Sequence, residues 1–228
     1  MKYKVDFEIE LNKNPYTGLY IALEGIDGAG KTTQAEDMAK YFREQGREVV
    51  VTAEPTRTGE IGSLVNRILK GEVKIPSKYN QYIFSADRGI HQEDLVIPSL
   101  KAGKVVISDR CFWSTLAYGI LDKEMVEGKR DENFDQMLVA YSILSFYHQF
   151  VVPDVTVLLD IDSDIAVDRL SKKGEGEIYE NKEMVEKVKA IYDLIVTKFP
   201  SEFTVVEGGK DEAEVTRDIA EKVKLLNK

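Results

Sequence analysis

Apolar side chains follow two spacings along this chain, which predict alternating strands and helices. Short apolar runs, typical of buried strands, begin near residues 19, 49, 104, 155 and 203. Helical spacing fills the stretches between and after them: 33–46, from 63, 79–102, 112–120, 133–150, from 163, 182–198 and from 212. This alternation predicts an α/β fold whose five-stranded, mostly parallel sheet is covered by helices on both faces.

The first residues do not fit that alternation. Residues 3–11 switch strictly between apolar and charged side chains, which predicts a half-buried strand. Turn-forming residues follow at 12–18, so we expect 1–18 to be an N-terminal β extension and 19–228 to be one domain. The strand is expected to extend one sheet edge; pairing with a second copy of the chain is the alternative.

Three features are expected to interrupt the regular elements. Pro98 should kink the stretch 79–102 or divide it into two helices. The charged segment 122–131 is predicted to be a loop. The polar segment 172–181 contains two glycines and is predicted to be the most mobile part of the chain.

A phosphate-binding loop lies between the first buried strand and its helix. Gly25, Gly30, Lys31 and Thr32 satisfy the pattern G-x-x-x-x-G-K-[ST] in full. A loop that turns its N–H groups toward a polyphosphate needs the conformational freedom of glycine, which Gly28 also provides. Lys31 can then reach the phosphates, and the Thr32 hydroxyl can bind Mg²⁺.

Composition narrows the range of partners. The 228 residues carry a net charge of −9, which argues against a nucleic-acid or membrane binder, because either would need a basic face. The single cysteine, Cys111, excludes an internal disulfide and is consistent with a reducing cytoplasm. His91 and His148 make no metal-binding pattern and are expected to be ordinary packing or surface residues. No apolar run approaches 18 residues, and no signal-peptide core is seen.

Charged residues follow two of the apolar runs. Arg57 comes after 49–53, where loops of an open α/β sheet form a binding crevice. Asp109 ends the run 104–108 and is expected to hold a metal-bound water beside the phosphate loop; capping the next helix is the alternative. Phe84 and Arg88 share one helix face, and by themselves indicate a core residue with a solvated neighbour.

Five segments in this order resemble the thymidylate kinases of the nucleoside-monophosphate kinase group: EGIDGAGKTTQ, EPTRTGEIG, FSADR, SDR followed by AYG, and PDVTVLLDID. The resemblance extends from Leu19 to about Leu226. It implies a P-loop NTPase three-layer fold, a homodimer, and a lid at about 170–181. The activity it implies is transfer of the γ-phosphoryl group of ATP to dTMP.

The resemblance also implies roles for individual residues. ATP would be held by the loop residues Gly25, Asp27, Gly28, Ala29, Gly30, Lys31, Thr32 and Thr33. Mg²⁺ would be held by Thr32 and, through water, by Asp109, with Glu24 assisting. The acceptor dTMP would contact Asp27 (at its 3′-hydroxyl), Arg57 and Arg110 (phosphate), Phe84 (stacking), Arg88 (exocyclic oxygen), Thr115 (pyrimidine edge), Tyr118 (crowding C2′) and Tyr179 (closing over it).

One departure from the family concerns the catalytic cations. Lys31, Arg57 and Arg110 match family positions, but family members usually add an arginine in the phosphate loop or the lid. Here the loop has Ala29, and the lid region offers Arg169, Lys172 and Lys173. A supplied arginine is worth roughly 10³–10⁵ in rate for phosphoryl transfer, so we expect one of these three to replace it on lid closure. Cys111 also replaces the usual aromatic residue after Asp-Arg.

Two other classes of function remain open at the level of sequence. The nearer is a related kinase acting on another deoxynucleotide or on a nucleoside. The more distant is an ATP-binding switch without catalysis, or a nucleic-acid motor. The acidic balance and the absence of a paired acidic residue after 104–108 count against the motor, and the arginines of the acceptor side would have no purpose in a switch.

Overall fold

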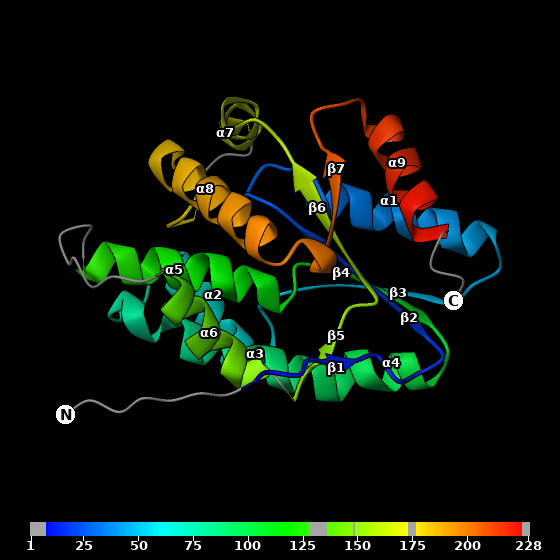
Figure 1. Ribbon diagram of the computed structural model, residues 1–228, viewed down its shortest axis with the longest axis horizontal. Helices are drawn as coiled ribbons and strands as arrows, with labels where there is room; N and C mark the ends of the chain where they lie inside the picture. The colour runs from blue at the N-terminus through cyan, green and yellow to red at the C-terminus, as the bar shows by residue number, and fades with distance from the viewer. Residues whose placement is uncertain (1–7, 128–135, 148, 173–176, 225–228) are drawn as a thin grey trace.

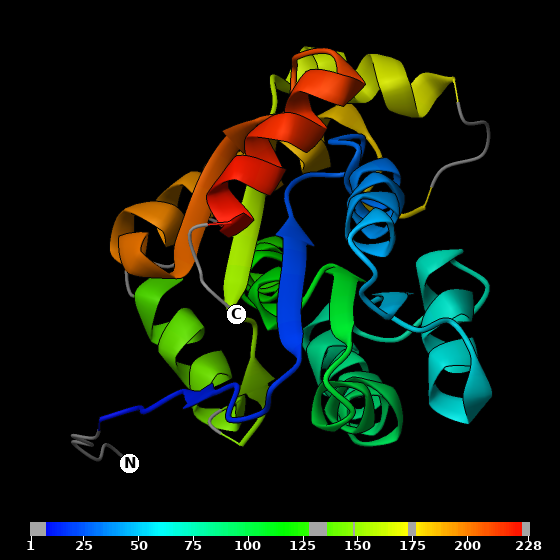
Figure 2. The same ribbon diagram turned by 90° about the vertical axis from the view of Figure 1, so that its right-hand side faces the viewer.

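A central parallel sheet organises the computed structural model, which describes residues 8–127, 136–147, 149–172 and 177–224. In the order in which they lie side by side, its strands are β3 (Val49–Ala53), β4 (Val105–Asp109), β2 (Leu19–Glu24), β6 (Val155–Asp160) and β7 (Phe203–Glu207). Each neighbouring pair is parallel. Figure 2 shows β2, in blue, at the middle of this order. The predicted α/β fold with five parallel strands is confirmed.

Helices cover both faces of the sheet (Figure 1). They are α1 (Lys31–Glu44), α2 (Gly59–Leu69), α3 (Asn80–His91), α4 (Ile97–Lys101), α5 (Phe112–Glu127), α6 (Gln136–Tyr147), α7 (Ser163–Ser171), α8 (Lys182–Lys198) and α9 (Glu212–Lys224). Shorter turns are the 3₁₀ segments η1 (Ser77–Tyr79) and η3 (Pro200–Glu202) and the π-helical segment η2 (Gln92–Val96).

The central strand β2 is buried on both sides, which explains its continuous apolar run. Leu19, Ile21 and Leu23 belong to the main core, which also contains Met38 of α1. Tyr20 points the other way and joins a smaller cluster with Leu100 of α4. Helices α1 and α9 pack against each other on one face of the sheet. Helix α4 packs on β4 from the opposite face.

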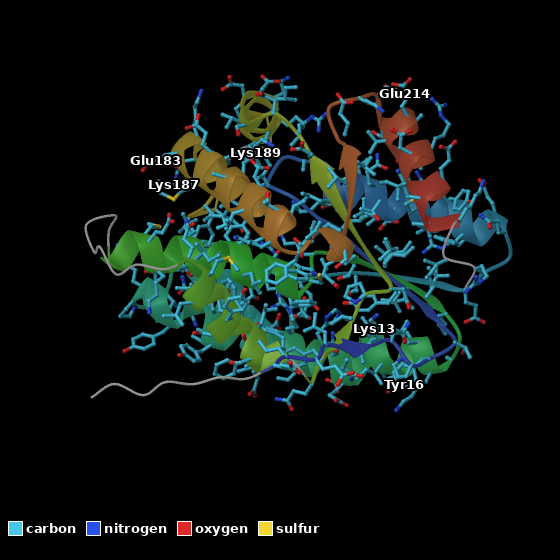
Figure 3. All side chains as sticks on the ribbon, viewed as in Figure 1. Lys13, Tyr16, Glu183, Lys187, Lys189 and Glu214 are labelled. Atoms are coloured by element: carbon cyan, nitrogen blue, oxygen red, sulfur yellow. The ribbon has the colours of Figure 1, made fainter. Side chains whose placement is uncertain are left out.

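An N-terminal β segment is present, but the strand predicted over residues 3–11 is wrong for its described part. Residues 8–11 form no strand, and β1 (Asn12–Lys13) pairs instead with β5 (Val151–Val152) in a separate two-stranded parallel sheet. Ile9 and Leu11 still pack against the main core. The apolar positions of this alternating segment are therefore partly buried by side-chain packing, without strand pairing at residues 8–11. Figure 3 shows Lys13 and Tyr16 on this segment near α4.

Two boundaries bear on the predictions made for the middle of the chain. The loop predicted over 122–131 is wrong for 122–127, because α5 continues to Glu127; the remaining residues lie outside the described part. The stretch 79–102 is divided as predicted, and Pro98 lies in the first turn of α4. A proline removes one backbone N–H donor, and here it comes directly after the π-helical segment η2.

Trp113, the chain's one tryptophan, sits at the start of α5 and is 1% exposed. Its ring centroid lies 4.8 Å from that of Phe112, 5.3 Å from that of Phe199 and 4.8 Å from that of Phe203. This aromatic group joins the first turn of α5 to the junction between α8 and η3 and to the edge strand β7.

Candidate active site

A cavity of about 620 Å³ lies at the edge of the sheet where the parallel strands end. Its walls come from the loops after β2, β3, β4 and β7, and from helices α3, α5 and α7. In open α/β sheets this edge is where ligands bind, and the volume is that of a small-molecule site.

The phosphate loop forms one end of the cavity. Gly28 has a φ of +85°, and a Cβ there would come within 2.5 Å of the carbonyl oxygen of Ala166 in α7, so a side chain is excluded twice. Residues 27–33, which the sequence assigns to ATP, all line the cavity. Gly25 does not line it; its carbonyl oxygen lies beneath the loop and accepts from Lys31 and Arg110.

Lys31 holds the loop in shape from inside. Its Nζ donates to the carbonyl oxygens of Gly25 (3.1 Å) and Ile26 (2.9 Å). Burial lowers the pKa of Lys31 to about 8, and the nearby positive charge of Arg110 adds to this while Asp27 opposes it. A bound phosphate would place negative charge beside Lys31 and so favour its protonated form, which burial and Arg110 disfavour.

Thr32 and Asp109 form a pair of oxygen ligands suited to Mg²⁺. Thr32 Oγ1 donates to Asp109 Oδ2 at 2.6 Å at the mouth of the loop. Within the described part of the chain, no group of three His, Cys, Asp or Glu side chains is placed to hold a metal. A hydroxyl, one carboxylate, water and substrate phosphates are a usual set for Mg²⁺ in such sites, so these residues fit the ion.

Glu24 does not fit its predicted role at the metal. Its carboxylate is fully buried and accepts from the backbone N–H of Cys111 (2.8 Å), from Ser114 Oγ (2.7 Å) and from Tyr192 OH (2.7 Å). It does not line the cavity. Glu24 therefore ties the start of α5 and helix α8 to the end of β2, a contact that the sequence did not predict.

Asp27, Arg110 and Tyr118 form a linked group beside the phosphate loop. Asp27 accepts from Arg110 Nη2 (2.5 Å) and from Tyr118 OH (2.8 Å). Burial raises the pKa of the Asp27 carboxyl, but the positive charges of Arg110 and Lys31 outweigh this effect and lower the pKa to about 2. Asp27 is therefore ionised at neutral pH and offers an acceptor for a ligand hydroxyl, while the Arg110 guanidinium faces the same space.

Arg57 reaches the cavity from the loop after β3. The loop is fixed by Asp87 of α3, whose carboxylate accepts from the Thr56 N–H (2.8 Å) and the Thr56 hydroxyl (2.6 Å). Arg57 has a φ of +60°, in the left-handed region that side-chain-bearing residues rarely adopt. Its guanidinium forms an ion pair with Glu177 of the lid segment, a contact that the sequence did not predict.

The opposite end of the cavity can hold a flat ring. Phe84 and Arg88 of α3 and Thr115 of α5, which the resemblance assigns to the acceptor base, line it together. Arg88 is buried and not solvated: it donates to Thr115 Oγ1 and forms an ion pair with Glu54. Sequence reasoning missed Glu54, although it directly follows β3, as Asp109 ends β4.

Tyr179 closes one side of the cavity from the lid segment. Its ring lies 5.0 Å from that of Tyr118 in an edge-to-face arrangement, and its hydroxyl donates to Asp122 at 2.7 Å. Asn80 donates to the same hydroxyl at 3.1 Å. Burial raises the pKa of Asp122 to about 6, even though its hydrogen bonds with Gln81 and Tyr179 oppose the change. The sequence did not predict this anchor.

The three cations proposed to replace a family arginine are in different places. Arg169 lines the cavity, with its guanidinium 3.4 Å from the carbonyl oxygens of Gly28 and Gly208. Lys172 pairs with Asp168 at the exposed end of α7 and does not line the cavity in this arrangement. Lys173 lies outside the described residues. Lys210, after β7, also lines the cavity.

A phosphate loop that faces an arginine-lined pocket across one cavity defines a P-loop nucleotide kinase. No helix in the described ranges is long and apolar enough to cross a membrane. The chain belongs to the thymidylate kinase family, whose model matches residues 23–219.

Individual relatives agree with the family match. A probable thymidylate kinase of Thermococcus kodakarensis is 35% identical over 217 residues, which cover 91% of this chain and 98% of the relative. A probable thymidylate kinase of Pyrococcus horikoshii is 34% identical, with 91% and 96% covered. A thymidylate kinase of Bifidobacterium longum is 29% identical, with 92% and 99% covered.

Proposed function

We infer that this protein transfers the γ-phosphoryl group of ATP to dTMP, giving ADP and dTDP. The observation that carries this proposal is one cavity that joins the phosphate loop to a ring-binding end formed by Phe84, Arg88 and Thr115. A donor polyphosphate and an acceptor nucleotide can therefore meet between the two ends. The family membership of the chain supports the same pair of substrates.

The donor phosphates would lie in the loop 25–33, against its backbone N–H groups and the N-terminus of α1. Lys31 would leave the carbonyl oxygens that it now contacts and bind the β- and γ-phosphates. Thr32 and Asp109 would hold Mg²⁺, which neutralises charge on the phosphates when bound. Arg169 would cover the donor from the side of α7, where it already lies next to Gly28.

The acceptor would be oriented from both of its ends. Arg57 and Arg110 would bind its phosphate, and Asp27 would accept from its 3′-hydroxyl. Phe84 would stack on the base, and Tyr118 would fill the space beside C2′ that a ribose hydroxyl needs. Phosphoryl transfer depends mainly on alignment and on cations around the transferred group, and these residues provide both.

Arg169 is the cation that we propose in place of the family arginine. It is the one of the three sequence candidates that lines the cavity in the described part of the chain. Arg169→Ala should lower kcat by at least about a hundredfold, while Lys172→Ala should stay within about twofold of wild type. Equal kcat values for Arg169→Ala and wild type would remove Arg169 from the catalytic group.

We also propose that the protein is a cytoplasmic homodimer. Large apolar side chains are exposed on α3 and α6, among them Tyr82 (62%) and Phe146 (56%), whose rings contact each other. Exposed apolar patches of this kind often mark protein interfaces. Light scattering after size exclusion should give twice the chain mass of 25.8 kDa, and a mass of one chain would contradict the dimer.

The activity can be tested by ADP release with ATP and Mg²⁺ against dTMP, dUMP, dCMP, dGMP and thymidine, each beside a control without acceptor. Turnover with dTMP well above the other acceptors is the expected result. Preference for another acceptor would keep the kinase class and overturn the assignment of the base. Hydrolysis that does not depend on any acceptor would favour an ATP-binding switch.

A further inference from the structure

The Arg88 guanidinium has most of its donors committed to the protein. Its Nε–H donates to a Glu54 carboxylate oxygen, and its Nη1 donates to Thr115 Oγ1 and to Tyr147 OH (3.0 Å). An arginine has five N–H donors, so the two on Nη2 remain. They have no hydrogen-bond partner among the residues that the structure describes, and Arg88 lines the cavity.

Glu54 fixes the other side of that guanidinium. Its side chain is 1% exposed, and its second oxygen contacts His91 Nδ1 at 3.0 Å. Burial raises the pKa of the Glu54 carboxyl, but the charge of Arg88 and the hydrogen bond from His91 lower it overall. Glu54 is therefore an ionised, buried carboxylate with a different donor on each oxygen.

His91 completes a chain of contacts that begins in the sheet. Its side chain is 3% exposed, and its Nε2 lies 2.7 Å from Thr52 Oγ1 of β3. An ionised carboxylate only accepts, so His91 Nδ1 carries the proton that is donated to Glu54. In a neutral ring Nε2 then accepts from the Thr52 hydroxyl. Thr52, His91, Glu54 and Arg88 thus form a connected series from β3 to the cavity.

We propose that Glu54 and His91 are positioning residues that orient Arg88 so that its Nη2 donates to the exocyclic oxygen of the acceptor base. The proposal rests on the proposed function, because it assigns Arg88 to that base. Neither residue touches the acceptor: Glu54 acts by holding Nε, and His91 acts by holding Glu54. Without His91, one oxygen of the Glu54 carboxylate loses its hydrogen-bond donor. The Glu54 carboxylate can then rotate together with the Arg88 guanidinium.

This arrangement has a consequence for the choice of base. Two fixed N–H donors fit a carbonyl oxygen, as in thymine, and meet another donor where cytosine carries its amino group. A loosened Arg88 would bind dTMP less tightly and would also turn away more easily from dCMP. Loss of positioning should therefore reduce both the affinity for dTMP and the ratio of dTMP to dCMP turnover.

The test compares His91→Leu, which removes the donor, with His91→Asn, whose amide can replace Nδ1–H. For His91→Leu we expect KM for dTMP to rise about tenfold, with kcat and KM for ATP within about threefold, since a hydrogen bond to a charged group is lost. The dTMP to dCMP ratio of kcat/KM should fall by a similar factor. Binding of dTMP without ATP, measured by calorimetry, should weaken equally, and His91→Asn should recover most of each change.

Gln92→Leu is the matched control. Gln92 is the next residue along the chain, is buried, and makes two hydrogen bonds to the Val151 backbone, on the side of the small cluster with β5. The Gln92→Leu substitution destabilises the same region but changes no contact in the series from Thr52 to Arg88. If Gln92→Leu shifts KM for dTMP and the base ratio as much as His91→Leu does, the role of His91 is only structural and the proposal is wrong.

Thr52→Val gives an independent measurement, because it keeps the volume of the side chain and removes only the outermost contact of the series. It should raise KM for dTMP by about two- to threefold. If His91→Leu does not fold, an unchanged KM in Thr52→Val overturns the proposal. Should the wild-type enzyme prefer another acceptor, the proposed function fails, and the same shifts measured with that acceptor decide on His91 and Glu54.

Discussion

Lys31 carries a charge that its surroundings make costly. Burial, followed by the positive charge of Arg110, lowers the pKa of its amino group to about 8. The free enzyme therefore loses this charge in a range where most lysines keep it. Because the charge is used to bind phosphate, the affinity of the empty site should depend on pH.

We expect the affinity for ATP, measured without acceptor, to fall as the pH rises from 7 to 9. With a pKa of about 8, the protonated fraction of Lys31 drops about tenfold over this range, and affinity should follow it up to that factor. Isothermal titration calorimetry at several pH values gives the measurement. Lys31→Met should bind weakly with no such slope, and an equal slope in that variant would assign the dependence to another group.

The pKa of Asp122 is shifted in the opposite direction to that of Lys31, and its effect is measured in stability. Its pKa is raised to about 6 by burial, so between pH 4 and 6 the folded chain binds a proton that the unfolded chain has released. Stability must then fall as the pH rises through that window. Relative to Asp122→Asn, the wild type should lose about 2 kcal/mol between pH 4.5 and pH 7.5.

Urea unfolding of both proteins at pH 4.5 and pH 7.5 measures this difference. The comparison cancels the other carboxylates, which are the same in both chains. A wild-type free energy of unfolding that changes in parallel with that of Asp122→Asn would show that Asp122 titrates as it does in the unfolded chain.

The lid segment 177–180 is an element fixed to several neighbours. The Ile178 N–H donates to the Leu69 carbonyl oxygen at the end of α2, and Tyr179 is held by Asp122 of α5 and Asn80 of α3. Glu177 adds the ion pair with Arg57. A carboxylate of the lid thus takes the place that the acceptor phosphate is proposed to occupy.

Glu177→Gln should therefore tighten binding of dTMP. The phosphate would no longer displace a charged competitor from Arg57, and an exposed ion pair of this kind accounts for about a two- to fivefold change in affinity. The measurement is the equilibrium dissociation constant for dTMP without ATP. Glu183→Gln is the control, because Glu183 pairs with Lys187 on the outer side of α8 (Figure 3). Weaker binding by Glu177→Gln would instead make Glu177 a support for Arg57.

The phosphate loop could be predicted from the sequence, because its residues form one short continuous motif in which each position has a fixed role. Contacts between distant segments were not predictable in the same way. Glu54 and His91 are 37 positions apart, and neither matches a spacing rule by itself. Glu24 was assigned to the metal because it precedes the loop, whereas its side chain points to α5 and α8, a direction that only the packing of those helices determines.

At the scale of the whole molecule, the N-terminal extension lies outside the family match, which begins at residue 23. Alternation predicted its strand, but the choice of partner depends on which surface of the folded domain is available. The described part of the extension uses β5 and the main core, away from the cavity. The extension is therefore expected to contribute to stability and not to turnover.

Deletion of residues 1–11 should lower the free energy of unfolding by about 1–3 kcal/mol, because Ile9 and Leu11 are only partly buried. Values of kcat and KM for both substrates should stay within about twofold of the full chain. Thermal unfolding and steady-state turnover measure the two quantities. A truncated chain with full stability and impaired turnover would instead connect the extension to the site.

Trp113 gives the molecule an optical probe of its own. The chain has one tryptophan, packed against aromatic rings from α5, from the junction between α8 and η3, and from β7, so its emission comes from a single environment. Fluorescence will report when that junction opens, without a label and without nucleotide. A ligand that changes its emission would be acting on the junction, beyond the pocket that binds it.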